Sequence, residues 1–263
     1  MNIHVVDLQK KIATPTNYVI DIGASYGVSS DPVYPFIVDS TFRGLCIEGL
    51  SDRIPRLREN IAPTFDVHNE FVNPGNICDI FEKYNVPVEL DVLKVDIDGY
   101  DLDLLRAILK KYRPKIIISE INEKIPPPVC FEIPYRDNYA WDNSHCFGFS
   151  LSAGKKVMDE HQYKILSVYE LNNMLCCNVE LCDTLGLDRA TDEMGVYRKG
   201  YKSKLSERIE HLPWNAGVER WLHINDKHKL IDEIRHYFTQ VNDRSQFAVK
   251  TKVEGTEFLL SLA

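Results

Sequence analysis

Short apolar runs rich in β-branched residues alternate with helical patterns through the first 120 residues of this 263-residue chain, and two further runs follow later. This alternation is typical of strands joined by crossover helices, which bring parallel strands together in one sheet. The expected strands are residues 18–22, 44–48, 65–72, 90–97, 115–119, 165–168 and 174–179. The pattern predicts an α/β fold, a Rossmann-like, doubly wound, mostly parallel sheet of seven strands.

Helices are expected between these strands, where apolar residues recur at helical spacing behind a capping residue or a proline. The expected helices begin near Asp31–Pro32, run from Ser51 to Ile61, and cover residues 76–84, 102–109 and 151–161. Crossover helices of this kind cover the faces of a parallel sheet.

The chain divides by composition into a main domain, residues 1–199, and a C-terminal extension, residues 200–263. The extension has 10 Lys and Arg against 9 Asp and Glu, a net charge of +1, whereas the whole chain has −8. One helical face is expected from Leu230, Ile231, Ile234, Tyr237 and Phe238. We expect a helical appendage packed on the main domain; the alternatives are a partner-binding module or a contact between copies of the chain.

Residues 124–149 interrupt the regular alternation. Three consecutive prolines at 126–128 precede a stretch of polar and aromatic residues without a period. Such a stretch is typical of a long functional loop or lid on the acceptor side of an active site. Its aromatic side chains suit a sugar or another flat acceptor, although they could equally serve as lid packing. They are Phe131, Tyr135, Tyr139, Trp141, Phe147 and Phe149.

Composition excludes several classes of protein. The acidic balance argues against a protein whose main task is to bind nucleic-acid phosphates. No apolar run approaches the ~18 residues that a transmembrane helix needs. The first residues lack the basic-then-apolar pattern of a signal peptide, so we expect a cytoplasmic protein.

The most informative segment is Asp21–Gly27, which follows the first expected strand. Its two glycines, Gly23 and Gly27, are spaced G-x-x-x-G, unlike the G-x-G-x-x-G of dinucleotide-binding proteins, which weakens the case for an NAD-dependent oxidoreductase. An acid before the first glycine would repel a pyrophosphate but attract an ammonium or sulfonium group, and S-adenosylmethionine has both. Glu48 ends the second expected strand, where a carboxylate can accept hydrogen bonds from a ribose diol. The alternative is a merely structural turn with Glu48 in solvent.

Several segments together resemble a known family. Val19–Ser29 resembles motif I of class I S-adenosylmethionine-dependent methyltransferases, and the following blocks resemble the FkbM-like branch of that superfamily. These blocks are Gly44–Gly49, Leu93–Asp101, Pro114–Asn122, Phe147–Leu151 and Gln162–Lys164. The resemblance implies transfer of a methyl group to a hydroxyl oxygen of a sugar, glycan or natural product, with S-adenosylhomocysteine as the second product.

The resemblance also implies which residues bind the cofactor. Asp21, Gly23, Ala24, Ser25 and Gly27 would surround the methionine part. Glu48 and Gly49 would contact the ribose. Phe71–Asn73, which include Val72, would lie beside the adenine. Asp96 and Ile97 would face the sulfonium end. One departure is Ser25–Tyr26, where relatives often have Asn-Asp.

A sugar hydroxyl is a poor nucleophile, so a general base or a bound cation must help to remove its proton. Asp98, Glu120 and Asn122 are predicted to line the acceptor site, with Asp98 and Glu120 as catalytic candidates. Oxygen ligands of this kind suit Mg²⁺ or Mn²⁺; alternatively, the acids cap the next helix. His145 is the other candidate base, because imidazole titrates near neutral pH.

Two other functions stay open at this point. The cofactor motifs do not encode the acceptor atom, so N-methylation of a small molecule is an alternative. A non-catalytic S-adenosylmethionine-binding scaffold is the other, although it would not need acids after the fourth strand.

Overall fold

The computed structural model describes residues 4–169, 172–188, 190–204, 206, 210, 213–240 and 258–262. Its central feature is a seven-stranded sheet with the order β3-β2-β1-β4-β5-β8-β7. The strands are β1 (Tyr18–Ile22), β2 (Arg43–Glu48), β3 (Phe65–Asn69), β4 (Val92–Val95), β5 (Ile116–Glu120), β7 (Tyr163–Tyr169) and β8 (Asn173–Asn178). The first five are parallel, and β8 is antiparallel to both β5 and β7. The predicted fold class is confirmed.

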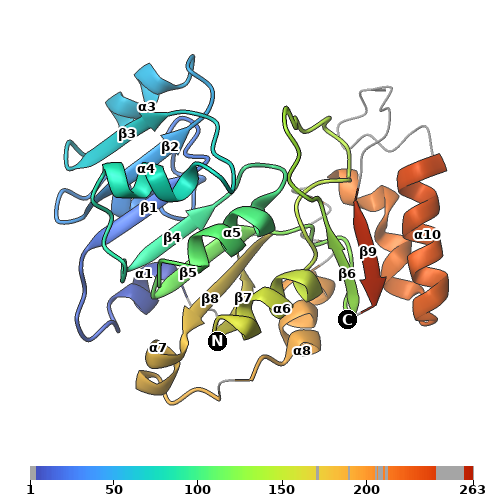
Figure 1. Ribbon diagram of the computed structural model, residues 1–263. Helices are drawn as coiled ribbons and strands as arrows, with labels where there is room; N and C mark the ends of the chain where they lie inside the picture. Colours follow the sequence, from blue (N-terminus) through green and yellow to red (C-terminus); the bar gives the residue numbers. More distant parts are fainter. Residues whose placement is uncertain are drawn as a thin grey trace.

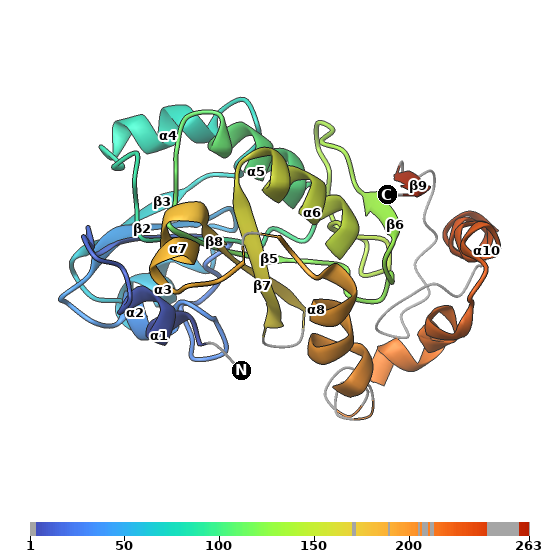
Figure 2. The same cartoon turned by 90° about the horizontal axis from the view of Figure 1, so that it is seen from below.

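Helices cover both faces of this sheet (Figures 1 and 2). One face packs against α1 (Val5–Gln9), α2 (Tyr34–Ile37), α3 (Ile54–Asn60) and α7 (Val179–Thr184). The other packs against α4 (Ile77–Lys83), α5 (Asp101–Leu109), α6 (Leu151–Glu160) and α8 (Glu193–Gly200). Within the described residues, no helix combines the length and the apolar character that crossing a membrane requires.

The alternation of side chains along β1 explains how one strand serves both faces. Ile20 and Ile22 belong to the apolar cluster on the α5 side, whereas Val19 belongs to the cluster on the α2 side. Every residue of β1 is buried, as expected for a strand in the middle of a parallel sheet. Asp21 therefore points away from the α5 side, because successive side chains alternate.

In the order β3-β2-β1-β4-β5, strands β2 and β3 lie on one side of β1 and strands β4 and β5 on the other, so the strand order reverses between β1 and β4. In open α/β sheets, ligands bind beyond the carboxyl ends of the strands at such a switch point. The turns after β1, β2, β4 and β5 all lie at this edge.

Several local expectations need correction. The helix expected from Asp31–Pro32 begins at Tyr34, and the helix expected from Ser51 begins at Ile54 without a side-chain cap. The helices α1, α7 and α8 were not predicted from the sequence. They have five to eight residues, and helices this short depend on tertiary packing rather than on their own propensity.

The C-terminal extension is not helical throughout. After the short 3₁₀ segments η1 (Lys202–Lys204), η2 (Pro213–Gly217) and η3 (Glu219–His223), helix α10 covers Lys227–Gln240, and strand β9 covers Leu259–Leu262. β9 pairs antiparallel with β6 (Val129–Glu132), which lies inside the expected loop 124–149. The extension and the loop therefore share a small sheet, an association that no periodicity in the sequence indicated.

Candidate functional site

A cavity of about 650 Å³ opens at the carboxyl ends of β1, β2, β4 and β5, a size typical of small-molecule sites. Its lining residues are Ile22, Gly23, Ser25, Ile47, Glu48, Gly49, Leu50, Arg53, Glu70, Phe71, Val72, Asp96, Ile97, Asp98, Tyr100, Glu120, Tyr139, Ala140 and Trp141. The cavity thus combines the glycine turn and the acids after β4 and β5 with the tip of the loop 124–149.

The turn after β1 forms one side of the cavity and requires a glycine. The backbone N–H groups of Gly23 and Ala24 both donate to the carbonyl of Ile47, at 2.9 and 3.1 Å. Gly23 has φ +78°, and a Cβ there would overlap the carbonyl oxygen of Asp96. The turn therefore packs backbone to backbone against the end of β4, and only glycine allows this approach.

Glu48 lies at the end of β2 and is held by the same turn. Its two carboxylate oxygens accept hydrogen bonds from the N–H groups of Ser25 and Leu50, both at 2.8 Å. Arg53 lies 3.8 Å from the same carboxylate. Each carboxylate oxygen has two acceptor sites, so both can accept one more hydrogen bond. This is the arrangement that recognition of a diol requires.

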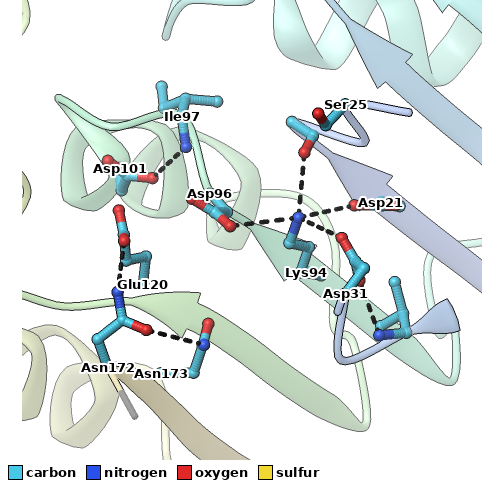
Figure 3. Close-up of polar contacts among 12 residues, drawn as sticks. Asp21, Ser25, Asp31, Lys94, Asp96, Ile97, Asp101, Glu120, Asn172 and Asn173 are labelled. Atoms are coloured by element: carbon cyan, nitrogen blue, oxygen red, sulfur yellow. Dashed lines mark hydrogen bonds and ion pairs between the residues drawn. The ribbon is translucent and has the colours of Figure 1, made fainter. Parts of the chain in front are cut away.

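Lys94, which was not predicted from the sequence, lies at the centre of a buried ionic group next to the cavity (Figure 3). Its side chain is 1% exposed, and its ammonium lies 2.7, 3.2 and 3.4 Å from oxygens of Asp31, Asp21 and Asp96. It also donates to the carbonyl of Gly23 at 3.1 Å. A lysine in the middle of a buried strand must have charged partners, and this signal could have identified it.

The parallel register of β1 and β4 places Asp21 directly beside Lys94. Asp21 is fully buried and does not line the cavity. The structure does not bring the predicted cofactor residue Asp21 to the cavity surface, and the cation that Asp21 contacts is the ammonium of Lys94. Lys94 joins Asp21 to the turn, because the same ammonium donates to the carbonyl of Gly23.

The pKa values of this buried group reflect its excess of carboxylates. Burial raises the pKa of Asp21 to about 7, with a further increase from the charge of Asp31 and a decrease from Lys94. Burial alone would lower the pKa of Lys94, but Asp21, Asp96 and Asp31 raise it well above its usual value. Lys94 is consequently charged at every physiological pH.

A second group of acids faces the cavity. Oxygens of Asp96, Asp98 and Glu120 lie within 4.8 Å of one another. Burial, and next the charge of Asp96, raises the pKa of Asp98 to about 6, and the same two causes raise the pKa of Glu120 well above its usual value. Such groups can take up a proton or hold a cation near neutral pH.

Asp101 supports this group from the start of α5. Its carboxylate accepts from the N–H groups of Ile97 at 2.8 Å and Gly99 at 2.9 Å. These bonds hold the turn in which Asp98 has a left-handed backbone, with φ +56°. Asp101 is fully buried and acts on the turn rather than on a ligand.

The structure does not bring Asn122 and His145 to the cavity. The side-chain amide of fully buried Asn122 donates to the carbonyls of His145 and Phe147, at 2.7 and 3.0 Å. His145 is 2% exposed and packs against Tyr237, and burial lowers its pKa to about 3. These positions do not suit a metal ligand or a general base for an acceptor in the cavity. The carboxylate that lies close to Asp98 and Glu120 is that of Asp96, and not the side chain of Asn122 that was predicted.

The remaining predicted residues divide by position. Those that line the cavity are Gly23, Ser25, Glu48, Gly49, Val72, Asp96, Ile97, Asp98 and Glu120. Ala24 and Gly27 are part of the turn but do not line the cavity: Ala24 is buried in the apolar cluster on the α2 side, and a Cβ on Gly27 would contact Leu57 and Ile61 too closely. Arg53 and Tyr100 line the cavity without having been predicted.

The chain is similar to a known family and to several solved structures. Residues 72–165 match the family described as Methyltransferase FkbM domain. The structure is similar to the O-methyltransferase TomG from Streptomyces achromogenes, solved with SAM, at 13% identity, with 66% of this chain and 77% of that chain covered and a TM-score of 0.41. The O-methyltransferase from Bacillus cereus, solved with SAH, is similar at 14% identity, with 66% and 78% covered and a TM-score of 0.40. A search of curated protein sequences gives no match.

The fold and the family match define the class of protein: this is an S-adenosylmethionine-dependent methyltransferase. More particularly, residues 72–165, which are 94 of the 263 residues, match the FkbM methyltransferase domain, and the resemblance predicted from the sequence is confirmed. The matched segment includes Asp96, Asp98 and Glu120, whereas the glycine turn and Glu48 precede it.

Replacement of Gly23 by Ala tests the turn. We expect Gly23→Ala to lower the free energy of unfolding by about 3 kcal/mol or more, because left-handed strain and overlap with Asp96 add. Gly186→Ala is the matched control, since Gly186 also has positive φ but nothing lies within 4 Å of a Cβ there; its cost should be about 1–2 kcal/mol. Equal costs in urea unfolding would contradict the close approach.

Replacement of Lys94 by Met tests the buried ion pairs. Asp21 and Asp31 would lose their cation, so we expect a loss of about 3–5 kcal/mol in unfolding free energy. The deficit should shrink toward about pH 4: carboxylates without a cation have raised folded-state pKa values, so the folded variant gains stability as pH falls. Lys111→Met removes an exposed pair with Glu82 and should cost no more than ~1 kcal/mol. A pH-independent deficit would contradict this account.

Proposed function

We propose that this protein is an O-methyltransferase that transfers the methyl group of S-adenosylmethionine to a hydroxyl of a sugar, glycan or natural-product acceptor. The observation that carries the proposal is one cavity in which a glycine turn and the Glu48 carboxylate, which can accept further hydrogen bonds, lie beside acids of raised pKa. The glycine turn and Glu48 suit the binding of the nucleoside, and the acids of raised pKa suit deprotonation of a hydroxyl.

The lining residues fit S-adenosylmethionine, which supplies the methyl group when bound. Glu48 has free acceptor capacity for the ribose hydroxyls, because its two hydrogen bonds come from backbone donors. Phe71 is 68% exposed and stands against Gly49, so its ring offers an apolar face for adenine. Gly23 and Ser25 offer the backbone of the turn to the methionine part.

Asp98 is the proposed general base. With a pKa of about 6 it is mostly ionised at neutral pH and can take the proton of an acceptor hydroxyl. Burial and the charge of Asp96 raise the pKa of Glu120 well above its usual value, which favours the protonated form, and a protonated carboxyl can donate a hydrogen bond to the acceptor oxygen. Tyr139 and Trp141 face the same space and offer aromatic surfaces to a sugar ring.

Cofactor binding is the first test. We expect S-adenosylhomocysteine, and not NAD, to give a heat of binding by calorimetry. Glu48→Gln should weaken that binding at least ~10-fold, because glutamine has one acceptor oxygen where two backbone donors and a diol must be satisfied. Glu59→Gln, an exposed change on α3, is the control and should leave the affinity unchanged. Absence of any heat would overturn the proposal.

The pH dependence tests Asp98. A base must be ionised, so methyl transfer should fall as pH drops through about 6 and should level off above it. Asp98→Asn should reduce turnover by about 10²–10⁴-fold while leaving the affinity for S-adenosylhomocysteine within a factor of two. Wild-type turnover in this variant would exclude Asp98 as the base.

The acids Asp96, Asp98 and Glu120 also form the set that would hold Mg²⁺ or Mn²⁺. Because Asp98 can act as a base without a metal, we expect methyl transfer to survive dialysis against a chelator. Loss of activity that Mg²⁺ or Mn²⁺ restores would assign the cation instead.

The acceptor is tested with labelled S-adenosylmethionine and a panel of glycosides, and mass spectrometry then locates the new methyl group. An ether is expected. A methylated nitrogen would favour the N-methyltransferase alternative, and cofactor binding without transfer to any acceptor would favour a scaffold.

A further inference from the structure

The C-terminal segment lies behind the loop that closes the cavity. One buried apolar cluster joins the two: it contains Ile125, Val129, Phe131, Ile133 and Cys146 from the loop and Val218, Trp221, Leu230, Ile234, Tyr237 and Phe238 from the extension. Figure 1 shows β9 beside β6 and α10 beyond β9. Among the described residues, the extension contributes nothing to the lining of the cavity.

One residue of the loop, Tyr139, contacts both the apolar cluster and the turn that contains Asp98. Tyr139 is packed against the same apolar cluster and lines the cavity. Its hydroxyl donates to the carbonyl of Asp98 at 3.3 Å, and its ring lies so close to Gly99 that a Cβ there would be 2.5 Å away. Tyr139 at the tip of the loop therefore packs directly against the turn that contains Asp98.

A buried polar contact joins the extension to the end of β5. The side-chain amide of Asn215, which is fully buried, donates to Glu123 at 2.9 Å. Glu123 is 1% exposed and lies 3.7 Å from the ammonium of Lys124, which in turn lies 4.3 Å from the ring centre of Phe147. The contact thus reaches the segment that follows Glu120 and the far end of the loop.

A buried polar contact of this kind need not raise the free energy of unfolding. A buried ionic group is often no more stable than a well-packed apolar one, but it satisfies its partners in only one arrangement. The Asn215–Glu123 hydrogen bond can therefore select one placement of the extension on residues 121–125, in addition to the contacts of the apolar cluster.

We propose that the C-terminal segment, described at 213–240 and 258–262, is the element that positions the acceptor side of the cavity. Through Asn215 and the apolar cluster it holds Tyr139 on the Asp98 turn, and so it determines which acceptors fit. Asn215 is a positioning residue, and the cofactor side, built from Gly23 and Glu48, does not depend on it. This inference rests on the proposed methyltransferase function.

The test exchanges the two partners of the hydrogen bond. Asn215→Asp places a carboxylate against Glu123, and Glu123→Gln combined with Asn215→Asp restores a donor and an acceptor in reversed order. Asn225→Asp makes the same chemical change at an exposed site of the extension and serves as the control. Each variant is measured as the full chain by calorimetry with S-adenosylhomocysteine, by hydrogen exchange of residues 133–147, and by methyl transfer to the best glycoside of the panel.

We expect Asn215→Asp to bind S-adenosylhomocysteine within twofold of wild type, to exchange at 133–147 at least tenfold faster, and to show a tenfold higher KM for the glycoside. The exchanged pair should recover most of both effects, and Asn225→Asp should show neither. If the exchanged pair stays impaired, or if cofactor affinity falls as far as the KM rises, the positioning role is wrong. Failure of the wild-type protein to bind S-adenosylhomocysteine would instead overturn the proposed function. Hydrogen exchange of residues 133–147 needs no acceptor, so it would still test whether Asn215 holds the loop.

Discussion

The ion pairs of the Lys94 ammonium are the interactions on which the glycine turn and the strand ends beside the cavity depend. It lies in the central strand β4 and contacts Asp21 on β1, Asp31 before α2, Asp96 after β4 and the carbonyl of Gly23. A charge without water is costly unless its partners surround it, so these contacts hold their segments in one arrangement. The glycine turn and the start of the acidic turn are thereby fixed relative to each other.

Carboxylates exceed cations throughout this edge of the sheet. Beneath the cavity three carboxylates share Lys94, and within it Asp98 and Glu120 face Asp96, where the charges of Lys94 and Arg53 only partly offset the increase in the pKa of Asp98. The raised pKa values of Asp98 and Glu120 follow from this excess and from burial. The same excess that costs stability makes a proton acceptor that is effective near neutral pH, a common feature of active sites.

The strands were predictable because a buried parallel strand needs an apolar run, and β1, β2, β4 and β5 each have one. The short helices were not, since α1 and α7 have five and six residues and are held by packing against the sheet rather than by their own sequence. On the cofactor side, Gly23 and Glu48 were predictable because a close backbone approach and a strand-end acid leave local signals. The pairing of β9 with β6 left none, because its partners are more than a hundred residues apart.

The sequence by itself determined the parallel α/β sheet, the glycine turn, and the acids that end β2, β4 and β5, since each depends on residue type and local spacing. Only the tertiary structure decided which charges meet. The register of β1 on β4 turned Asp21 toward Lys94, the packing of α10 buried His145 against Tyr237, and the turn held by Asp101 brought Asp96 and Asp98 to Glu120. These outcomes depend on side-chain direction and on distance across the fold, because electrostatic partners are chosen by separation in space and by burial.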